Sequence, residues 1–156
     1  MIDYKIIIPA RYNSRRFPGK PLVKIHGKTM LERVWLNASE SAASEIIIAT
    51  DDQRIETAAK NFGANVCVTS NKHKSGTDRI IEAIELLGLR DDEIILNVQG
   101  DEPLLSNKLM DECASLISGR EDCIGTLASP FSIGERLDDP NLVKVLVNTQ
   151  GYAIYF

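Results

Sequence analysis

Near the start of the chain stands the stretch 4–9, YKIIIP, a short apolar run. A strand buried on both faces of a sheet has this pattern, whereas a half-exposed strand alternates apolar and polar residues. Similar runs recur at 45–50 (EIIIAT), 65–69 (NVCVT) and 93–98 (EIILNV), and a segment typical of a helix follows each of the four strands. Regular alternation of buried strands and helices predicts an α/β fold with three layers, a mostly parallel sheet flanked by helices.

Each predicted helix begins at a residue whose side chain can cap it. The candidate caps are Thr29 (in a capping box with Glu32), Asp51 or Asp52, Thr77 or Asp78, and Ser106. We also expect a fifth strand at 123–129 and a hairpin of strands at 143–147 and 152–156. The sequence is therefore interpreted as one domain, 1–156. Because it stops inside an apolar strand, we expect the chain to continue in the parent protein.

Composition narrows the class of protein. The chain has 156 residues, 44% of them hydrophobic and 26% charged, which is enough for one domain with a buried core. No apolar run approaches the roughly 18 residues of a membrane span, and the first residues lack the pattern of a signal peptide. The three cysteines are widely spaced and odd in number, which is typical of reduced thiols. We therefore expect a cytoplasmic protein with no membrane partner.

The net charge of −4 at pH 7 conceals a strong asymmetry. Residues 4–31 contain seven of the 18 basic residues and no acidic one, whereas the other 11 basic residues stand against all 22 acidic ones. Proteins that bind long duplexes usually have a broad basic face and a basic pI. An acidic protein with one concentrated cationic segment is predicted to hold a discrete anion, with no nucleic-acid partner.

The cationic segment centres on the loop 9–22, PARYNSRRFPGKPL. Arginine offers forked donors to phosphate oxygens and lysine a movable point charge, so Arg11, Arg15 and Lys20 are candidate phosphate ligands. Gly19 allows a ligand to approach the backbone closely. The loop is neither a Walker A motif nor a dinucleotide fingerprint. Its two interpretations are a phosphate-binding loop and an ordinary exposed basic loop.

Two more polar loops follow predicted strands at the same edge of the sheet. This edge is formed by the carboxyl ends of the strands, where parallel sheets bind their ligands. Asp101, in the segment 99–103 (QGDEP), could hold Mg²⁺ beside a polyphosphate, or it could simply cap a turn. In the segment 73–79 (HKSGTDR), Ser75, Thr77 and the helix amides could bind a base, ribose or phosphate. The alternative there is a helix cap with no ligand.

Taken together, these motifs resemble one family. The segments 8–12 (IPARY), 17–22 (FPGKPL), 73–79 and 97–103 (NVQGDEP) occur in the order and pattern of 3-deoxy-manno-octulosonate (KDO) cytidylyltransferases, also called CMP-KDO synthetases. The likeness continues through 141–145 and 151–156, so it covers essentially the whole chain. The resemblance implies a nucleotide-diphospho-sugar transferase fold, with 1–156 as the nucleotide-binding domain, incomplete at its C-terminal side.

The resemblance also implies a reaction. CTP and KDO would give CMP-KDO and pyrophosphate in a Mg²⁺-dependent transfer that serves lipopolysaccharide biosynthesis, in a homodimeric enzyme. By motif match, Arg11 and Lys20 would hold the CTP phosphates, with Arg15 near the phosphates or the sugar acid, and Asp101 would bind Mg²⁺ and count with them as catalytic. The positions matched to substrate binding around the cytidine are Ala10, Ser75, Gly76, Thr77, Arg79 and Gln99.

Two other interpretations stay open at this point. A CMP-sialic acid synthetase shares the expected fold and chemistry, and assays with both acid sugars separate it from the KDO enzyme. A catalytically silent nucleotide-binding fragment would keep affinity for CTP without releasing pyrophosphate.

Overall fold

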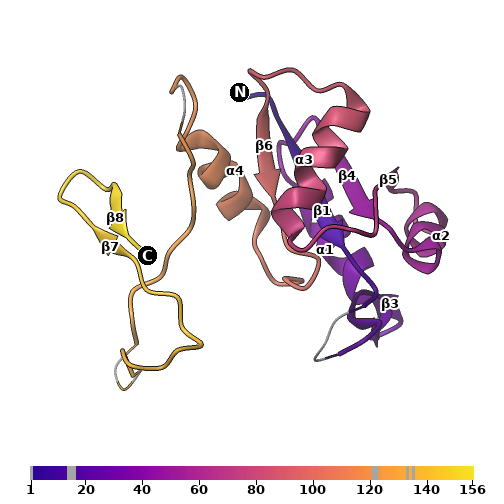
Figure 1. The fold of residues 1–156 in the computed structure, drawn as a ribbon, viewed down its shortest axis with the longest axis horizontal. Helices are drawn as coiled ribbons and strands as arrows, with labels where there is room; N and C mark the ends of the chain where they lie inside the picture. The colour runs from indigo at the N-terminus through magenta and orange to yellow at the C-terminus, as the bar shows by residue number, and fades with distance from the viewer. Residues whose placement is uncertain (1, 14–16, 121–122, 133, 135) are drawn as a thin grey trace. The chain divides into compact units, whose positions relative to one another are not determined.

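A computed structural model describes residues 2–13, 17–120, 123–132, 134 and 136–156. The chain forms two compact units, Met1–Gly125 and Thr126–Phe156. The first unit contains a four-stranded sheet in the order β5-β4-β1-β6 (Figure 1). Its strands are β1 (Tyr4–Ala10), β4 (Glu45–Thr50), β5 (Asn65–Val68) and β6 (Ile94–Asn97).

The sheet is parallel throughout, and β1 lies in its interior. Ile6 pairs with Ile46 of β4 on one side and with Leu96 of β6 on the other. Ile6, Ile7 and Ile8 are fully buried, which explains why the first strand is a continuous apolar run. The predicted parallel sheet between helices is confirmed.

Helices cover both faces of this sheet. They are α1 (Met30–Ser39), α2 (Gln53–Asn61), α3 (Gly76–Leu87) and α4 (Asn107–Ser115). On one face, α1, α2 and α4 bury residues such as Leu31, Ile55 and Met110 against β1 and its neighbours. On the other face, Ile80 and Ala83 of α3 pack against the second side of the strands (Figure 1). Two hydrophobic layers therefore hold the sheet in place.

The helix starts are mostly as predicted. Thr29 accepts a hydrogen bond from the Glu32 amide at the start of α1, and Asp52 caps α2. Ser106 is the N-cap residue of α4, without a side-chain capping bond. The start of α3 was predicted wrongly. Its cap is Ser75, not Thr77 or Asp78, because the Ser75 hydroxyl and the Asp78 carboxylate bond each other's backbone amides in a complete capping box.

Short elements complete the first unit. The loop after β1 leads into a single 3₁₀ turn, η1 (Lys20–Leu22), and into the small antiparallel pair β2 (Lys24–Ile25) and β3 (Lys28–Thr29). All three cysteines are free thiols. No helix in the described parts of the chain has both the length and the apolar character needed to cross a membrane.

The second unit contains the predicted hairpin, with shorter strands. Strands β7 (Leu146–Val147) and β8 (Ala153–Tyr155) pair antiparallel. The strand predicted at 123–129 is wrong, because these residues pair with no described strand and β6 stands at the edge of the sheet. The segment contains the point where the two units meet in sequence, and Ile124 is almost fully exposed. An apolar run without a partner strand forms no ladder.

Candidate functional site

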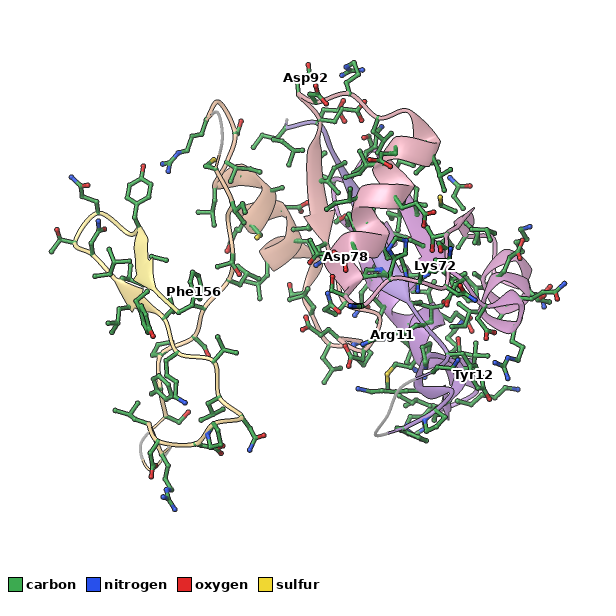
Figure 2. The ribbon with its side chains drawn as sticks, in the orientation of Figure 1. Arg11, Tyr12, Lys72, Asp78, Asp92 and Phe156 are labelled. Atoms are coloured by element: carbon green, nitrogen blue, oxygen red, sulfur yellow. The ribbon has the colours of Figure 1, made fainter. Side chains whose placement is uncertain are left out.

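A polar pocket of about 200 Å³ lies in the first unit. It is lined by Pro9, Ala10, Arg11, Lys20, Pro21, Ser75, Gly76, Arg79, Gln99, Gly100 and Asp101. These residues come from the end of β1 and the loop after it, the start of α3 and the loop after β6. Figure 2 shows Arg11 and Asp78 at one end of the sheet and Asp92, which precedes β6, at the opposite end. The pocket therefore lies at the carboxyl ends of the strands, as predicted.

Most of the predicted site residues meet in this pocket. Eight of them line it, namely Ala10, Arg11, Lys20, Ser75, Gly76, Arg79, Gln99 and Asp101. Thr77 lies in the first turn of α3 but is not part of the lining. Arg15 lies outside the residues that the structure describes.

Lys20 and Asp101 form an ion pair within the pocket. The Lys20 ammonium lies 2.6 Å from Asp101 Oδ2, and the two side chains are 35% and 47% exposed. Lys20 opens the 3₁₀ turn η1, whose cap Gly19 has a φ of 73° and donates its amide to the Tyr12 carbonyl at 2.8 Å. A left-handed residue fixes the direction in which the chain re-enters the pocket. The cation and the carboxylate are thus held within reach of one ligand.

Two glycines of the lining, Gly76 and Gly100, lie against Pro9. A Cβ on Gly76 would lie 3.4 Å from the Pro9 ring, and a Cβ on Gly100 would lie 3.4 Å from the Pro9 carbonyl oxygen. A side chain at either position would therefore pack against Pro9. Beside them, the Gln99 side-chain amide donates to Asn97 Oδ1 at 2.9 Å, which fixes the orientation of Gln99.

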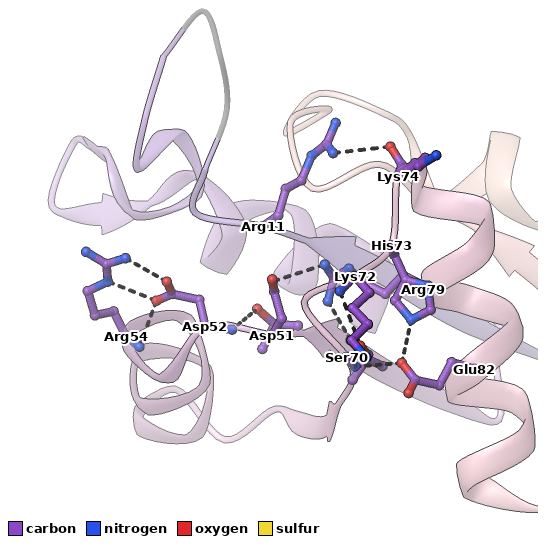
Figure 3. A network of polar contacts seen from close by, with 12 residues as sticks. Arg11, Asp51, Asp52, Arg54, Ser70, Lys72, His73, Lys74, Arg79 and Glu82 are labelled. Atoms are coloured by element: carbon purple, nitrogen blue, oxygen red, sulfur yellow. Dashed lines mark hydrogen bonds and ion pairs between the residues drawn. The ribbon is translucent and has the colours of Figure 1, made fainter.

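Arg79 is the buried cation of the site, with 3% of its surface exposed. Its guanidinium donates to Thr69 Oγ1 at 2.5 Å and lies 3.0 Å from Asp51 Oδ1 (Figure 3). Among the described residues Asp51 Oδ1 accepts no hydrogen bond of good geometry, so Arg79 balances its charge directly. A buried charge needs such a partner because burial removes it from water. Arg79 is thus a fixed wall of the pocket, not a mobile arm.

The loop before α3 brings another contact to the site. Arg11 donates to the Lys74 carbonyl at 3.5 Å (Figure 3), and the capping box of α3 begins at the next residue. The hydrogen bonds from Ser75, first through its hydroxyl and then through its backbone, lower the pKa of the Asp78 carboxyl. Asp78 is therefore ionised at neutral pH, and its charge complements the positive end of the helix dipole.

The carboxylate chemistry of the pocket bears on metal binding. Asp101 is the acidic residue of the lining, and the described residues hold no cluster of three or more His, Cys, Asp or Glu side chains that could enclose a metal. Mg²⁺ usually takes one or two protein carboxylates together with substrate phosphates and waters. A single exposed carboxylate beside the cationic side chains of Arg11 and Lys20 fits an ion shared with a bound phosphate group.

No site role was predicted for Asp51 or Thr69, which contact Arg79, or for Glu82, which contacts the loop before α3. Asp51 was considered as a helix cap, whereas in the structure it faces Arg79 and the next residue, Asp52, caps α2. A usable signal existed for the first two, because Asp51 directly follows β4 and Thr69 directly follows β5. Polar residues at the carboxyl ends of neighbouring parallel strands converge on one edge.

Comparison with known proteins identifies relatives of this chain. A 3-deoxy-manno-octulosonate cytidylyltransferase of Aliivibrio fischeri is 46% identical over 99% of this chain, and one of Serratia proteamaculans is 49% identical over the same share. Among solved structures, a CMP:2-keto-3-deoxy-manno-octonic acid synthetase complexed with CTP superposes with a TM-score of 0.75 and 32% identity over 98% of this chain.

These relatives are longer than the chain. The chain spans 62% of the length of both bacterial relatives and 62% of the synthetase structure. The family model described as cytidylyltransferase matches residues 5–156. The family resemblance predicted from the motifs is confirmed, and the chain belongs to the cytidylyltransferase family.

Proposed function

We propose that this chain carries the nucleotide half of an enzyme that transfers CMP from CTP to KDO and releases pyrophosphate. The observation that carries the proposal is the convergence of Arg11, Lys20 and Asp101 in one pocket at the carboxyl ends of the strands. The names of the relatives and the CTP-bound synthetase structure support the choice of nucleotide and of acid sugar.

In this proposal the phosphates of CTP bind Arg11 and Lys20. A triphosphate entering the pocket competes with Asp101 for the Lys20 ammonium, which lies 2.6 Å from that carboxylate before binding. Arg11 can leave the long contact with the Lys74 carbonyl at little cost, because a 3.5 Å hydrogen bond is weak. Both cations neutralise the pyrophosphate leaving group as the KDO hydroxyl attacks the α-phosphorus. We also place Arg15 near the phosphates or the sugar acid.

The cytidine end is proposed to lie on the wall made by Ala10, Ser75, Gly76, Arg79 and Gln99, with Thr77 behind it. Gly76 and Gly100 belong to the same lining and add no side chain to it. At about 200 Å³ the pocket is smaller than the roughly 300–1,000 Å³ of typical ligand sites. It therefore suits part of one nucleotide, and the described residues do not enclose the acid sugar as well.

We propose that Asp101 holds Mg²⁺ when nucleotide is bound. The ion would supply charge neutralisation at the α-phosphate. The role of the chain's own residues is to place one carboxylate and two cations around the same phosphate chain, so that the charges balance before reaction. We further propose that the full-length enzyme is a homodimer in the cytoplasm. Light scattering of the full-length protein tests the dimer.

Pyrophosphate release from CTP and Mg²⁺, measured with KDO and separately with sialic acid, tests the function in the full-length protein. KDO-dependent release supports the proposal, and release with sialic acid alone overturns it. For the chain itself, calorimetry of CTP with Mg²⁺ is the matching test. CTP affinity without pyrophosphate release in the full-length protein identifies a silent nucleotide-binding module.

A further inference from the structure

The loop from Ser70 to Ser75 joins β5 to α3 and forms one side of the pocket. Its last residue caps α3 and lines the pocket together with Gly76, and its Lys74 carbonyl accepts the hydrogen bond from Arg11. The residues of this loop belong to no helix or strand. No ladder or helix bonds therefore order this loop, and its contacts with the side chains of α3 become the important ones.

One carboxylate of α3 contacts both halves of this loop. Glu82 Oε2 accepts a hydrogen bond from the Ser70 amide at 2.7 Å, and the same oxygen lies 2.5 Å from His73 Nε2 (Figure 3). Hydrogen bonds from the His73 side chain and then from the Ser70 amide lower the pKa of the Glu82 carboxyl. Glu82 is thus an ionised acceptor, and charge-assisted hydrogen bonds are stronger than neutral ones.

A second contact extends this attachment toward the site. Arg79 stands three residues before Glu82 on α3 and holds Thr69, the residue directly before Ser70. Residues three apart on a helix share a face, so Arg79 and Glu82 hold consecutive loop residues from one side. The ordered path therefore runs from α3 through the loop to Lys74, Arg11 and the pocket.

We propose that Glu82 is a positioning residue, which fixes the loop 70–75 so that Ser75, Gly76 and the Lys74 carbonyl stand ready for the nucleotide. Glu82 does not line the pocket, so it acts through the loop and not through the ligand. This inference rests on the proposed CTP site. A rigid loop spares the nucleotide the entropy of ordering it, and loss of that order weakens binding.

The test compares Glu82→Ala with Glu85→Ala, a carboxylate one turn along the same helix. Hydrogen exchange of the amides of 70–76 is measured without ligand, and the CTP dissociation constant with Mg²⁺ is measured by calorimetry. Glu82→Ala should speed loop exchange at least tenfold and weaken CTP binding by roughly 5- to 20-fold, less than the full energy of the lost charge-assisted bonds because they order the loop and do not contact the nucleotide. Glu85→Ala should change neither. Glu82→Gln keeps an acceptor for the Ser70 amide and should recover part of the affinity.

Two outcomes separate this inference from the function on which it rests. A wild-type chain that binds no CTP overturns the proposed function, and the positioning role with it. A wild-type chain that binds CTP, beside a folded Glu82→Ala variant of equal affinity, overturns the positioning role alone. If Glu82→Ala does not fold, His73→Ala replaces it, because this change removes one of the two contacts and should weaken CTP binding about threefold. Unchanged affinity in that variant also overturns the inference.

Discussion

Lys20 Nζ and Asp101 Oδ2 lie 2.6 Å apart, although 81 positions separate these residues in sequence. In the proposed function the first binds phosphate and the second a metal ion, so the two side chains would exchange each other for these ligands when nucleotide binds. Exposed ion pairs contribute about 0–1 kcal/mol. Exchange of this pair for phosphate and metal contacts is therefore inexpensive, and the pair keeps both groups ordered in the meantime.

Replacement of Lys20 by methionine should weaken CTP binding roughly 10- to 150-fold, because one charge-assisted contact to phosphate contributes about 1.5–3 kcal/mol. Lys24→Met is the matched control, since Lys24 belongs to the same cationic segment but does not line the pocket. Calorimetry with CTP and Mg²⁺ measures both variants. Equal losses in the two would mean that only the total charge of the segment matters.

Asp101→Asn should abolish the dependence of CTP affinity on Mg²⁺. In the wild-type chain we expect tighter binding with Mg²⁺ than with EDTA, because the carboxylate and the phosphates share the ion. The neighbouring Glu102→Gln does not alter the pocket lining and should behave as wild type. Persistence of the Mg²⁺ effect in Asp101→Asn would assign the metal to another residue.

Gly19→Ala should lower both stability and CTP affinity. Its φ of 73° is unfavourable for alanine by about 1–2 kcal/mol, and the new Cβ would lie 3.0 Å from the Tyr12 ring. Gly27→Ala is the control, because its φ of 83° carries the same backbone penalty with no atom within 4 Å. Urea unfolding and CTP titration of both variants separate the two effects. A Gly27→Ala variant with the same loss of affinity would contradict a specific role for the turn before Lys20.

Tyr4 should make the unfolding free energy fall at alkaline pH. Burial, followed by the hydrogen bond to Asp111 at 2.6 Å, raises its pKa to about 12. The folded state prefers the protonated phenol. Its contribution to the free energy of unfolding is therefore complete below about pH 10 and is lost as the pH rises from 10 to 12. The loss is about 1.4 kcal/mol per pH unit in that window.

Tyr4→Phe tests this linkage. At pH 8 the variant should be less stable by about 1 kcal/mol, because Asp111 loses a donor although it still accepts from the Ala42 amide. Urea unfolding at pH 8, 10 and 11 should show this difference vanish between pH 10 and 11, because wild type loses about 1.4 kcal/mol over that unit. A constant difference across this range would contradict the prediction. It would mean that the pKa of Tyr4 is the same in the folded and unfolded protein.

The strands of the sheet could be predicted because each is an apolar run with both faces buried, as at Ile6–Ile8. The strand predicted at 123–129 was wrong, because a strand also needs a neighbouring strand to pair with. The apolar content of a segment does not reveal whether such a neighbour exists. The start of α3 was placed two or three residues late. Ser75, Thr77 and Asp78 are all good caps by type, and only the reciprocal bonds of Ser75 and Asp78 decide between them.

The pocket was predictable to a similar extent. Strand ends of a parallel sheet converge, so the polar residues after β1 and β6 could be grouped before their distances were known. The pairing of Lys20 with Asp101 could not be predicted. It depends on the path of the loop between β1 and Lys20, which the residue types do not determine. The buried contacts of Arg79 also escaped, since an arginine in a polar motif gives no sign of its own burial.

The interior position of β1 has a consequence for synthesis of the protein. Its first neighbour, β4, ends at Thr50, but its second, β6, ends only at Asn97. A growing chain must therefore hold its most apolar strand with one edge unpaired while the next 47 residues leave the ribosome. Asp101 follows later still, so the earliest nascent chain that contains the whole lining of the pocket is already two thirds of the present sequence long.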